Sequence, residues 1–194
     1  MKWNNHNNLA GKHATLSPSG YAWLNYDAEK MRTTYLNKLK VEQGTYLHDL
    51  ASRLISNRIR VEDVGLTFNM FVNDSIVNRM DSEVLLYYSD NCFGTADAIR
   101  FDEDSHTLYI FDLKTGSTQA SFKQLYIYCA LYCLEYGYVN KRAVNRMNFI
   151  CRLYQKDELL EEIIEPSVVW GCMEKIKDMD KVLSDLKIEV LGDL

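Results

Sequence analysis

The chain has 194 residues, of which 47% are hydrophobic and 12% aromatic, and its formal net charge is −5. This length and composition fit one folded domain with a buried core, and no run approaches the ~18 apolar residues that a membrane helix needs. The acidic balance argues against a protein that coats nucleic acid non-specifically, because such proteins are basic. An acidic net charge is still compatible with a binding surface that is lined locally by basic residues next to an acidic centre.

The N-terminal stretch is polar, rich in asparagine, and lacks the apolar core of a signal peptide. We expect residues 1–15 to form a loose arm, residues 16–194 to form a single domain, and the protein to be cytoplasmic. The five cysteines are an odd number, which in a cytosolic chain favours free thiols. Cys129 and Cys133 lie four apart in a helical segment. They either share a metal or pack as small core residues, and we favour packing.

Apolar residues spaced three and four apart predict helices, and alternating apolar residues predict strands. The expected helices cover 18–36, with Ser17 as N-cap, and 40–57, 67–80, 122–136 and 168–186. The expected strands cover 83–89, 93–102, 107–115, 148–155 and 163–164. This order predicts an α/β fold with a central mixed β-sheet flanked by helices on both sides. The apolar stripe of the last helix, 168–186, indicates a docking face.

The stretch Phe93–Gly116 has the pattern of two strands joined by a tight polar turn. A two-residue turn at Asp104 and Ser105 would fix the antiparallel register. It would pair Phe101 with Leu108, Ile99 with Ile110, and Asp97 with Asp112. Asp-Ser is not the Asn-Gly signal of a two-residue hairpin, so a longer loop would shift this register.

In that register Asp97, Asp112 and Lys114 share one face of the hairpin. Directly opposed side chains have Cβ atoms roughly 4.5–5.5 Å apart, so the two carboxylates repel unless a cation lies between them. A divalent cation with oxygen ligands fits, with the carbonyl of Leu113 as a further ligand. Lys114 would stand beside the cation, where it can stabilise a phosphate or orient a water. Taken alone, a D-x-K pattern is more often two solvated strand ends and a surface lysine.

Two helices carry further candidates. His48 lies at the edge of an apolar stripe, where a lone histidine is usually a packed core residue. As a ligand, its neutral imidazole would complete a site with the two aspartates and favour Mn²⁺ somewhat over Mg²⁺. Gln124 and Tyr128 lie one turn apart on the helix 122–136 and can point the same way. They would offer an amide and a phenol hydroxyl to a phosphate chain.

Four short motifs occur in a fixed order along the chain. They are Gly44-Thr45-Tyr46-Leu47-His48, Gly94-Thr95-Ala96-Asp97, Asp112-Leu113-Lys114, and Gln124 with Tyr128. This ordered set resembles the motifs of the PD-(D/E)XK nucleases of the RecB and lambda-exonuclease type. The resemblance covers roughly residues 16–155. It is closest to small RecB-like nucleases of phages and prophages.

The resemblance implies a restriction-endonuclease-like core and a role for each matching residue. Asp97 and Asp112 resemble the metal-binding catalytic carboxylates of that family. His48 resembles a third metal ligand, the carbonyl of Leu113 a fourth, and Lys114 the catalytic lysine. Matching residues on the later helix, Gln124 and Tyr128, resemble those that hold the DNA backbone and support the site.

The implied activity is a DNA nuclease dependent on Mg²⁺ or Mn²⁺, which hydrolyses phosphodiester bonds. We expect an exonuclease that serves recombination, replication or DNA end-processing. The alternatives are an endonuclease on the same fold, and a non-catalytic nucleic-acid-binding or regulatory protein that kept the fold. Intact Asp97, Asp112 and Lys114 argue against the last of these.

Some members of the family carry a four-cysteine iron–sulfur cluster. This chain has no cysteine before His48, and its C-terminal region has only Cys151 and Cys172, so we predict no cluster. No helicase motif is present, so unwinding of DNA would need a recombination or helicase partner protein. The sequence leaves the oligomeric state open, including a homo-oligomer, and predicts no contact with a membrane.

Overall fold

The structure, a computed structural model, describes residues 14–191. The chain divides into two compact units, Met1–Gly44 and Thr45–Leu194. Of the predicted polar arm 1–15, residues 1–13 lie outside the described residues. Every predicted site residue from His48 onward belongs to the second unit, and a single domain over 16–194 stays a prediction.

The predicted helices 18–36 and 40–57 are wrong as separate elements. The chain instead forms a short 3₁₀-helix, η2 (Tyr21–Asn25), and one long helix, α1 (Ala28–Ser56). Ser17 does not cap a helix, because its hydroxyl lies 2.8 Å from that of Ser19 and the first helical element begins only at Tyr21, with Gly20 as N-cap. The side chain of Asp27 caps α1 instead, accepting from the amide of Lys30 at 2.7 Å. No glycine or proline lies between 36 and 40, so the helix continues.

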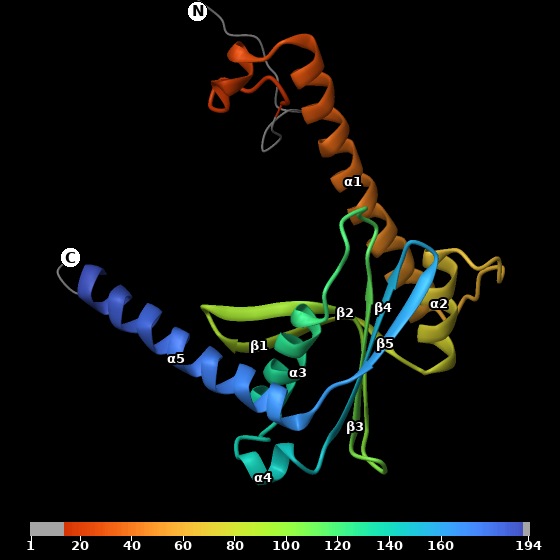
Figure 1. The fold of residues 1–194 in the computed structure, drawn as a ribbon, viewed down its shortest axis with the longest axis vertical. Helices are drawn as coiled ribbons and strands as arrows, with labels where there is room; N and C mark the ends of the chain where they lie inside the picture. The colour runs from red at the N-terminus through yellow and green to blue at the C-terminus, as the bar shows by residue number, and fades with distance from the viewer. Residues whose placement is uncertain (1–13, 192–194) are drawn as a thin grey trace, which may run out of the picture. The chain divides into compact units, whose positions relative to one another are not determined.

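The second unit is built on a five-stranded mixed sheet in the order β1-β2-β3-β4-β5 (Figure 1). The strands are β1 (Asp81–Ser89), β2 (Cys92–Asp102), β3 (Thr107–Leu113), β4 (Asn148–Gln155) and β5 (Glu158–Ile163). Strands β3 and β4 pair in parallel, and the other neighbours are antiparallel. The parallel pair is joined through α3 (Lys123–Glu135) and a short helix that the sequence did not predict, α4 (Lys141–Val144). The predicted mixed sheet with a helical crossover is therefore confirmed.

Helices cover both faces of this sheet, as predicted. On one face α3 and α5 (Pro166–Leu191) pack over Leu108 and Ile110 of β3. On the other face α2 (Thr67–Val77) and the last turns of α1 pack over Phe111 and Leu113. Because side chains alternate between the two faces of β3, its residues pack into two separate cores. Cys129 and Cys133 are buried in the first core, which agrees with the packing interpretation.

The β2–β3 hairpin has the predicted register but not the predicted turn. Phe101 pairs with Leu108 and Ile99 with Ile110, while the turn comprises residues 103–106 and not two residues. The turn is longer by one residue on each strand, so the register is unchanged. The predicted backbone pair of Asp97 with Asp112 is wrong, because the ladder ends at Ala98 and Phe111. Beyond that point the Asp97 carboxylate itself accepts a hydrogen bond from the Leu113 amide, at 2.8 Å.

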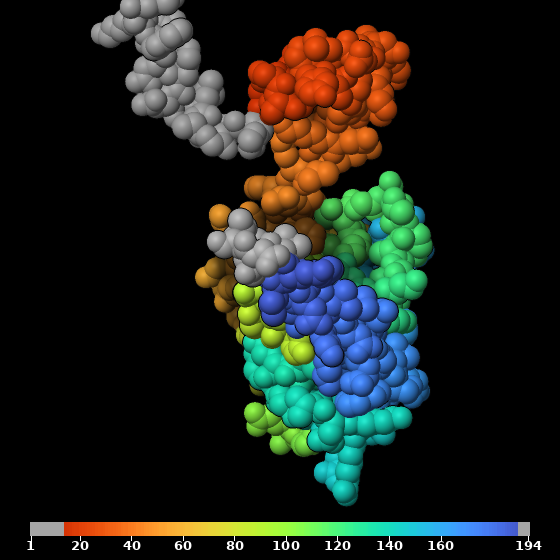
Figure 2. Space-filling model, turned by 90° about the vertical axis from the view of Figure 1, so that its left-hand side faces the viewer, coloured from red at the N-terminus to blue at the C-terminus, as the bar shows by residue number. Residues whose placement is uncertain are grey.

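The β1–β2 hairpin reaches the surface beside α5, where its yellow-green tip adjoins the blue helix in Figure 2. Asp180 of α5 accepts hydrogen bonds from Ser89 at 2.6 Å and from Asn91 at 2.9 Å. A β-bulge between Tyr87 and Ser89 shifts the register of this hairpin. The two contacts fix the tip of the hairpin to the helix.

Candidate metal centre

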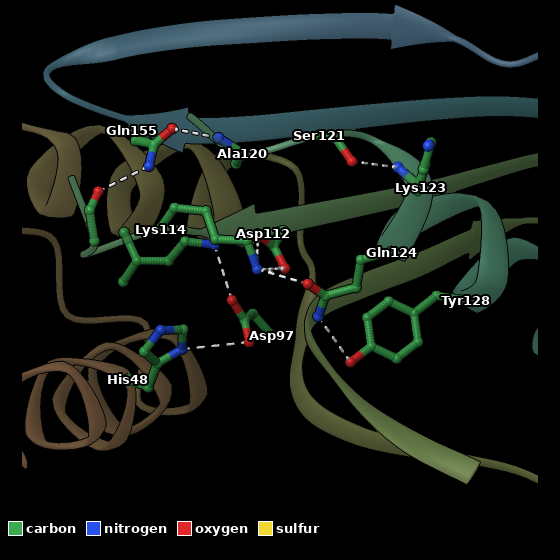
Figure 3. Close-up of polar contacts among 12 residues, drawn as sticks. His48, Asp97, Asp112, Lys114, Ala120, Ser121, Lys123, Gln124, Tyr128 and Gln155 are labelled. Carbon is green, nitrogen blue, oxygen red and sulfur yellow. Dashed lines mark hydrogen bonds and ion pairs between the residues drawn. The ribbon is translucent and has the colours of Figure 1, made fainter. Parts of the chain in front are cut away.

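Three side chains from three elements converge at one end of the sheet. His48 comes from α1, Glu83 from the start of β1, and Asp97 from β2. One ligand atom from each lies within 4.8 Å of the others, so this group could hold a metal ion. His48 Nδ1 is 3.3 Å from Asp97 Oδ1, and Figure 3 shows the two side chains facing each other.

The sequence did not predict Glu83 as part of this group. A hairpin closed simply at Asp90 and Asn91 would set Glu83 level with Ala98 and not with Asp97. The bulge moves the register by one residue, so the flanking pairs of β1 and β2 set Glu83 level with Asp97. A bulge of this kind leaves no clear mark in the sequence, which is why the residue was missed.

Glu83 also has a strained backbone. Its φ angle is 53°, in the left-handed region that side chains other than glycine rarely adopt. Such a conformation costs about 1–2 kcal/mol relative to the right-handed region. Strain of this kind gathers at functional sites, where the surrounding structure enforces it. Here the strained residue is Glu83, whose carboxylate lies in the group with His48 and Asp97.

The electrostatics of the group favour a bound cation. The hydrogen bond to Asp97 raises the pKa of His48, so the imidazole tends to keep a proton when no metal is present. Burial, followed by the negative charge of Asp97, raises the pKa of Glu83. The raised pKa of His48 reflects its hydrogen bond to the negatively charged Asp97, whereas the raised pKa of Glu83 reflects mainly its burial; a proton or a metal ion would relieve both effects.

Asp112 lies beside this group but is not part of it. Its side chain is 2% exposed and pairs with Lys114, whose Nζ lies 3.0 Å from Oδ1 and 2.8 Å from Oδ2. Burial, and next the charge of Asp97, raise the pKa of Asp112 to about 6 despite the opposing effect of the lysine. Oδ2 is buried and accepts no hydrogen bond, even though the lysine neighbours it.

These donors fit a divalent metal. A buried carboxylate oxygen with unused lone pairs is an available ligand atom. Carboxylates with one imidazole suit Mn²⁺, and carboxylates alone suit Mg²⁺. The predicted ligands His48 and Asp97 are brought together, and Asp112 lies next to them with Lys114 as its present counter-ion. The role of the Leu113 carbonyl stays a prediction.

A chain of hydrogen bonds connects Lys114 to α3, as Figure 3 shows, and a further bond leads back to β2. Lys114 Nζ donates to Gln124 Oε1 at 2.7 Å, and Gln124 Nε2 donates to the Tyr128 hydroxyl at 3.2 Å. The Tyr128 hydroxyl then donates to the carbonyl of Thr95 at 2.6 Å. Burial raises the pKa of Tyr128, so the hydroxyl keeps the proton that this bond requires. The structure therefore gives Gln124 and Tyr128 supporting contacts within the protein.

A further buried residue, Gln155, organises the loop after Lys114 and was not predicted. Its Oε1 accepts from the amide of Ala120 at 3.0 Å, and its Nε2 donates to the carbonyls of Gly116 and Thr118 at 2.8 and 2.7 Å. The parallel pairing of Leu113 with Tyr154 brings this glutamine next to Lys114. The amide thus fixes the segment that leads from the lysine to α3.

No family model matches the sequence, and no curated protein or solved structure is significantly similar to it. The resemblance to PD-(D/E)XK nucleases therefore depends on the four sequence motifs alone and stays a prediction. Among the helices formed by residues 14–191, none combines the length and apolar character needed to cross a bilayer.

Proposed function

We propose that this protein is a divalent-metal-dependent DNA nuclease of the PD-(D/E)XK type, which hydrolyses phosphodiester bonds. The observation that carries the proposal is the position of Lys114. Its ammonium group is fixed between Asp112 and Gln124, beside a His48–Glu83–Asp97 group that could hold a metal ion. Carboxylates, an imidazole and a fixed lysine are the side chains that metal-assisted phosphodiester hydrolysis uses.

His48, Glu83 and Asp97 would hold the metal, with Asp112 as the adjoining carboxylate. A metal bound there would lower the pKa of an attacking water and neutralise charge on the phosphate. Asp97 is further fixed by the Leu113 amide, which leaves its second oxygen directed at His48. These contacts orient the ligands before any substrate arrives.

Lys114 would act directly on the phosphate. Its side chain is 27% exposed, so it is held on one side and open on the other. In that position the ammonium group can donate to a phosphate oxygen as negative charge grows there. Gln124 and Tyr128 would keep the lysine in place, and we assign them this supporting role in preference to direct contact with the DNA backbone.

The decisive experiment uses linear and circular DNA with Mn²⁺, Mg²⁺ or EDTA. We expect cleavage with metal only, and its loss in Lys114→Ala and Asp97→Asn. Lys177→Ala is the matched control, because Lys177 forms an exposed ion pair with Glu174 on α5. Cleavage that persists in EDTA or in both site variants would overturn the mechanism. An exonuclease, which we propose, degrades linear DNA and spares closed circles, whereas an endonuclease cuts both.

A further inference from the structure

The exposed face of the β1–β2 hairpin continues directly from the metal centre. Exposure alternates along β1, so that Glu83, Leu85 and Tyr87 face solvent while the residues between them face the core. Leu85 pairs with Thr95 and Tyr87 pairs with Phe93, so their side chains form successive rows. The rows start at the level of Glu83 and Asp97 and lead away from the metal centre along the strands.

The outermost row is a pair of exposed aromatic rings. Tyr87 is 45% exposed and Phe93 is 59% exposed, and their rings stack with centroids 6.4 Å apart and an interplanar angle of 24°. Leu85, 56% exposed, adds an apolar side chain in the row between them and the metal centre. Phe93 lies four residues before Asp97, which is about 13 Å along a strand at ~3.3 Å per residue.

This hairpin is held rigidly. Glu135 of α3 accepts a hydrogen bond from the Tyr87 amide at 2.9 Å, and the Tyr128 hydroxyl donates to the Thr95 carbonyl. The contacts of Asp180 with Ser89 and Asn91 fix the tip. The Tyr87 hydroxyl donates to Asp90 at 2.9 Å, which restrains the ring. Exposed rings on a fixed support lose little conformational entropy when a ligand stacks on them.

We propose that Leu85, Tyr87 and Phe93 form a stacking surface for the bases of single-stranded nucleic acid whose backbone enters the metal centre. The proposal rests on the proposed nuclease function and names its substrate class. Unpaired bases stack on exposed aromatic rings whatever their sequence, whereas in a duplex each base is already stacked and paired. A strand that leaves the metal centre along this hairpin meets the rings within its next nucleotides.

The surface carries no charge of its own, because Leu85, Tyr87 and Phe93 are all uncharged. It therefore recognises bases and leaves the phosphates to the metal and to Lys114. Binding energy from stacking depends little on salt, while phosphate contacts weaken steeply as salt rises. The contribution of Tyr87 and Phe93 should thus be the same at low and high ionic strength.

The test measures binding apart from cleavage. Asp112→Asn serves as the cleavage-deficient background, and fluorescence anisotropy follows a short single-stranded oligonucleotide and its duplex in Ca²⁺. We expect Tyr87→Ala and Phe93→Ala each to weaken single-strand binding by about tenfold, with duplex binding unchanged. Phe93→Tyr keeps the ring and should bind normally, whereas Phe93→Leu keeps the apolar character and should bind as weakly as Phe93→Ala. Tyr136→Ala is the matched control, since Tyr136 is 55% exposed and its ring stacks on Tyr132 and not on Tyr87 or Phe93.

The outcomes separate this proposal from the nuclease proposal. If the wild-type protein cleaves DNA but single-strand binding survives both alanine substitutions, the stacking surface is wrong and the nuclease stands. Normal binding by Phe93→Leu would also overturn it, because a merely apolar surface would then suffice, as for a protein partner. If the wild-type protein cleaves no substrate and binds no oligonucleotide, both proposals fail.

Discussion

The ring of Tyr128 occupies the space that a side chain at Gly94 would need. A Cβ atom added at Gly94 would lie 3.1 Å from Cε1 of that ring, closer than ordinary van der Waals contact. The glycine of the G-x-x-D motif therefore lets α3 approach β2 closely enough for the Tyr128 hydroxyl to reach the Thr95 carbonyl.

Gly94→Ala should displace Tyr128 and loosen the chain of hydrogen bonds that holds Lys114. We expect nuclease activity to fall at least as far as in Tyr128→Phe, with a stability loss of about 1–3 kcal/mol, the usual cost of overpacking. Denaturant unfolding and cleavage rates measure the two effects. Gly171→Ala is the control, because nothing lies within 4 Å of a Cβ there. Full activity in Gly94→Ala would show that the close approach is not needed.

Asp112→Asn should stabilise the metal-free protein at neutral pH. The folded-state pKa of Asp112 is raised to about 6 from a normal value of 3.8, so between these values the folded state holds a proton that the unfolded state has lost. Stability therefore falls as the pH rises through this window. Removing the buried charge should recover roughly 1–3 kcal/mol at pH 8 and little at pH 4.

The measurement is denaturant unfolding of both proteins in EDTA across that pH range. Asp112→Asn should also be inactive when metal is present. The substitution would then remove activity while it raises the stability of the fold. An Asp112→Asn protein that is less stable than wild type at pH 8 would mean that the Lys114 ion pair outweighs the cost of burial.

Glu83→Gln should weaken metal binding without unfolding the protein. The amide keeps the size of the side chain but loses the charge, so we expect Mn²⁺ affinity to fall by about tenfold or more, the scale seen when a metal site loses a supporting group. Titration calorimetry measures this, with Glu174→Gln of the exposed α5 ion pair as control. In the wild type, affinity should rise with pH as His48, whose pKa is raised, gives up its proton. Equal affinities in Glu83→Gln and wild type would remove Glu83 from the ligand set.

Gln155→Ala should free the loop between Lys114 and α3. It removes three hydrogen bonds to loop backbone groups, and each group left buried without a partner costs about 1–3 kcal/mol. We expect faster hydrogen exchange over 116–120 and a lower cleavage rate. Gln155→Glu keeps the oxygen that accepts from Ala120 but loses both N–H donors. Protonation of the new carboxylate at lower pH would restore one donor, so part of the lost activity should return there. Unchanged exchange in the loop would contradict the anchoring role.

The alternation of Ile99, Phe101, Leu108 and Ile110 was enough to predict the register of the central hairpin, because a sheet with helices on both faces tolerates no slip. The same pattern could not reveal the four-residue turn, since a turn that takes one residue from each strand leaves the pairing of the rest unchanged. It also could not reveal where the pairing of β2 with β3 ends. Beyond that point the Asp97 carboxylate, and not a backbone carbonyl, accepts the hydrogen bond from the Leu113 amide.

The candidate site was predicted in part. His48, Asp97, Asp112 and Lys114 could be found because they stand at motif positions on recognisable elements. The position of Glu83 beside Asp97 depends on the β-bulge between Tyr87 and Ser89. The position of Gln155 beside Lys114 depends on the parallel pairing of two strands that are distant in sequence. Neither relationship is local, so residue spacing carries no signal for it.

The parallel pairing of β3 with β4 also sets the order in which a newly made chain can become competent. The amide of Lys114 donates its hydrogen bond to the carbonyl of Tyr154, so this contact cannot form before β4 has been synthesised. The meander of β1, β2 and β3 pairs locally and can form earlier. A nascent chain on the ribosome could therefore gather His48, Glu83 and Asp97, the group that could hold a metal ion, before the Lys114 backbone pairs with β4.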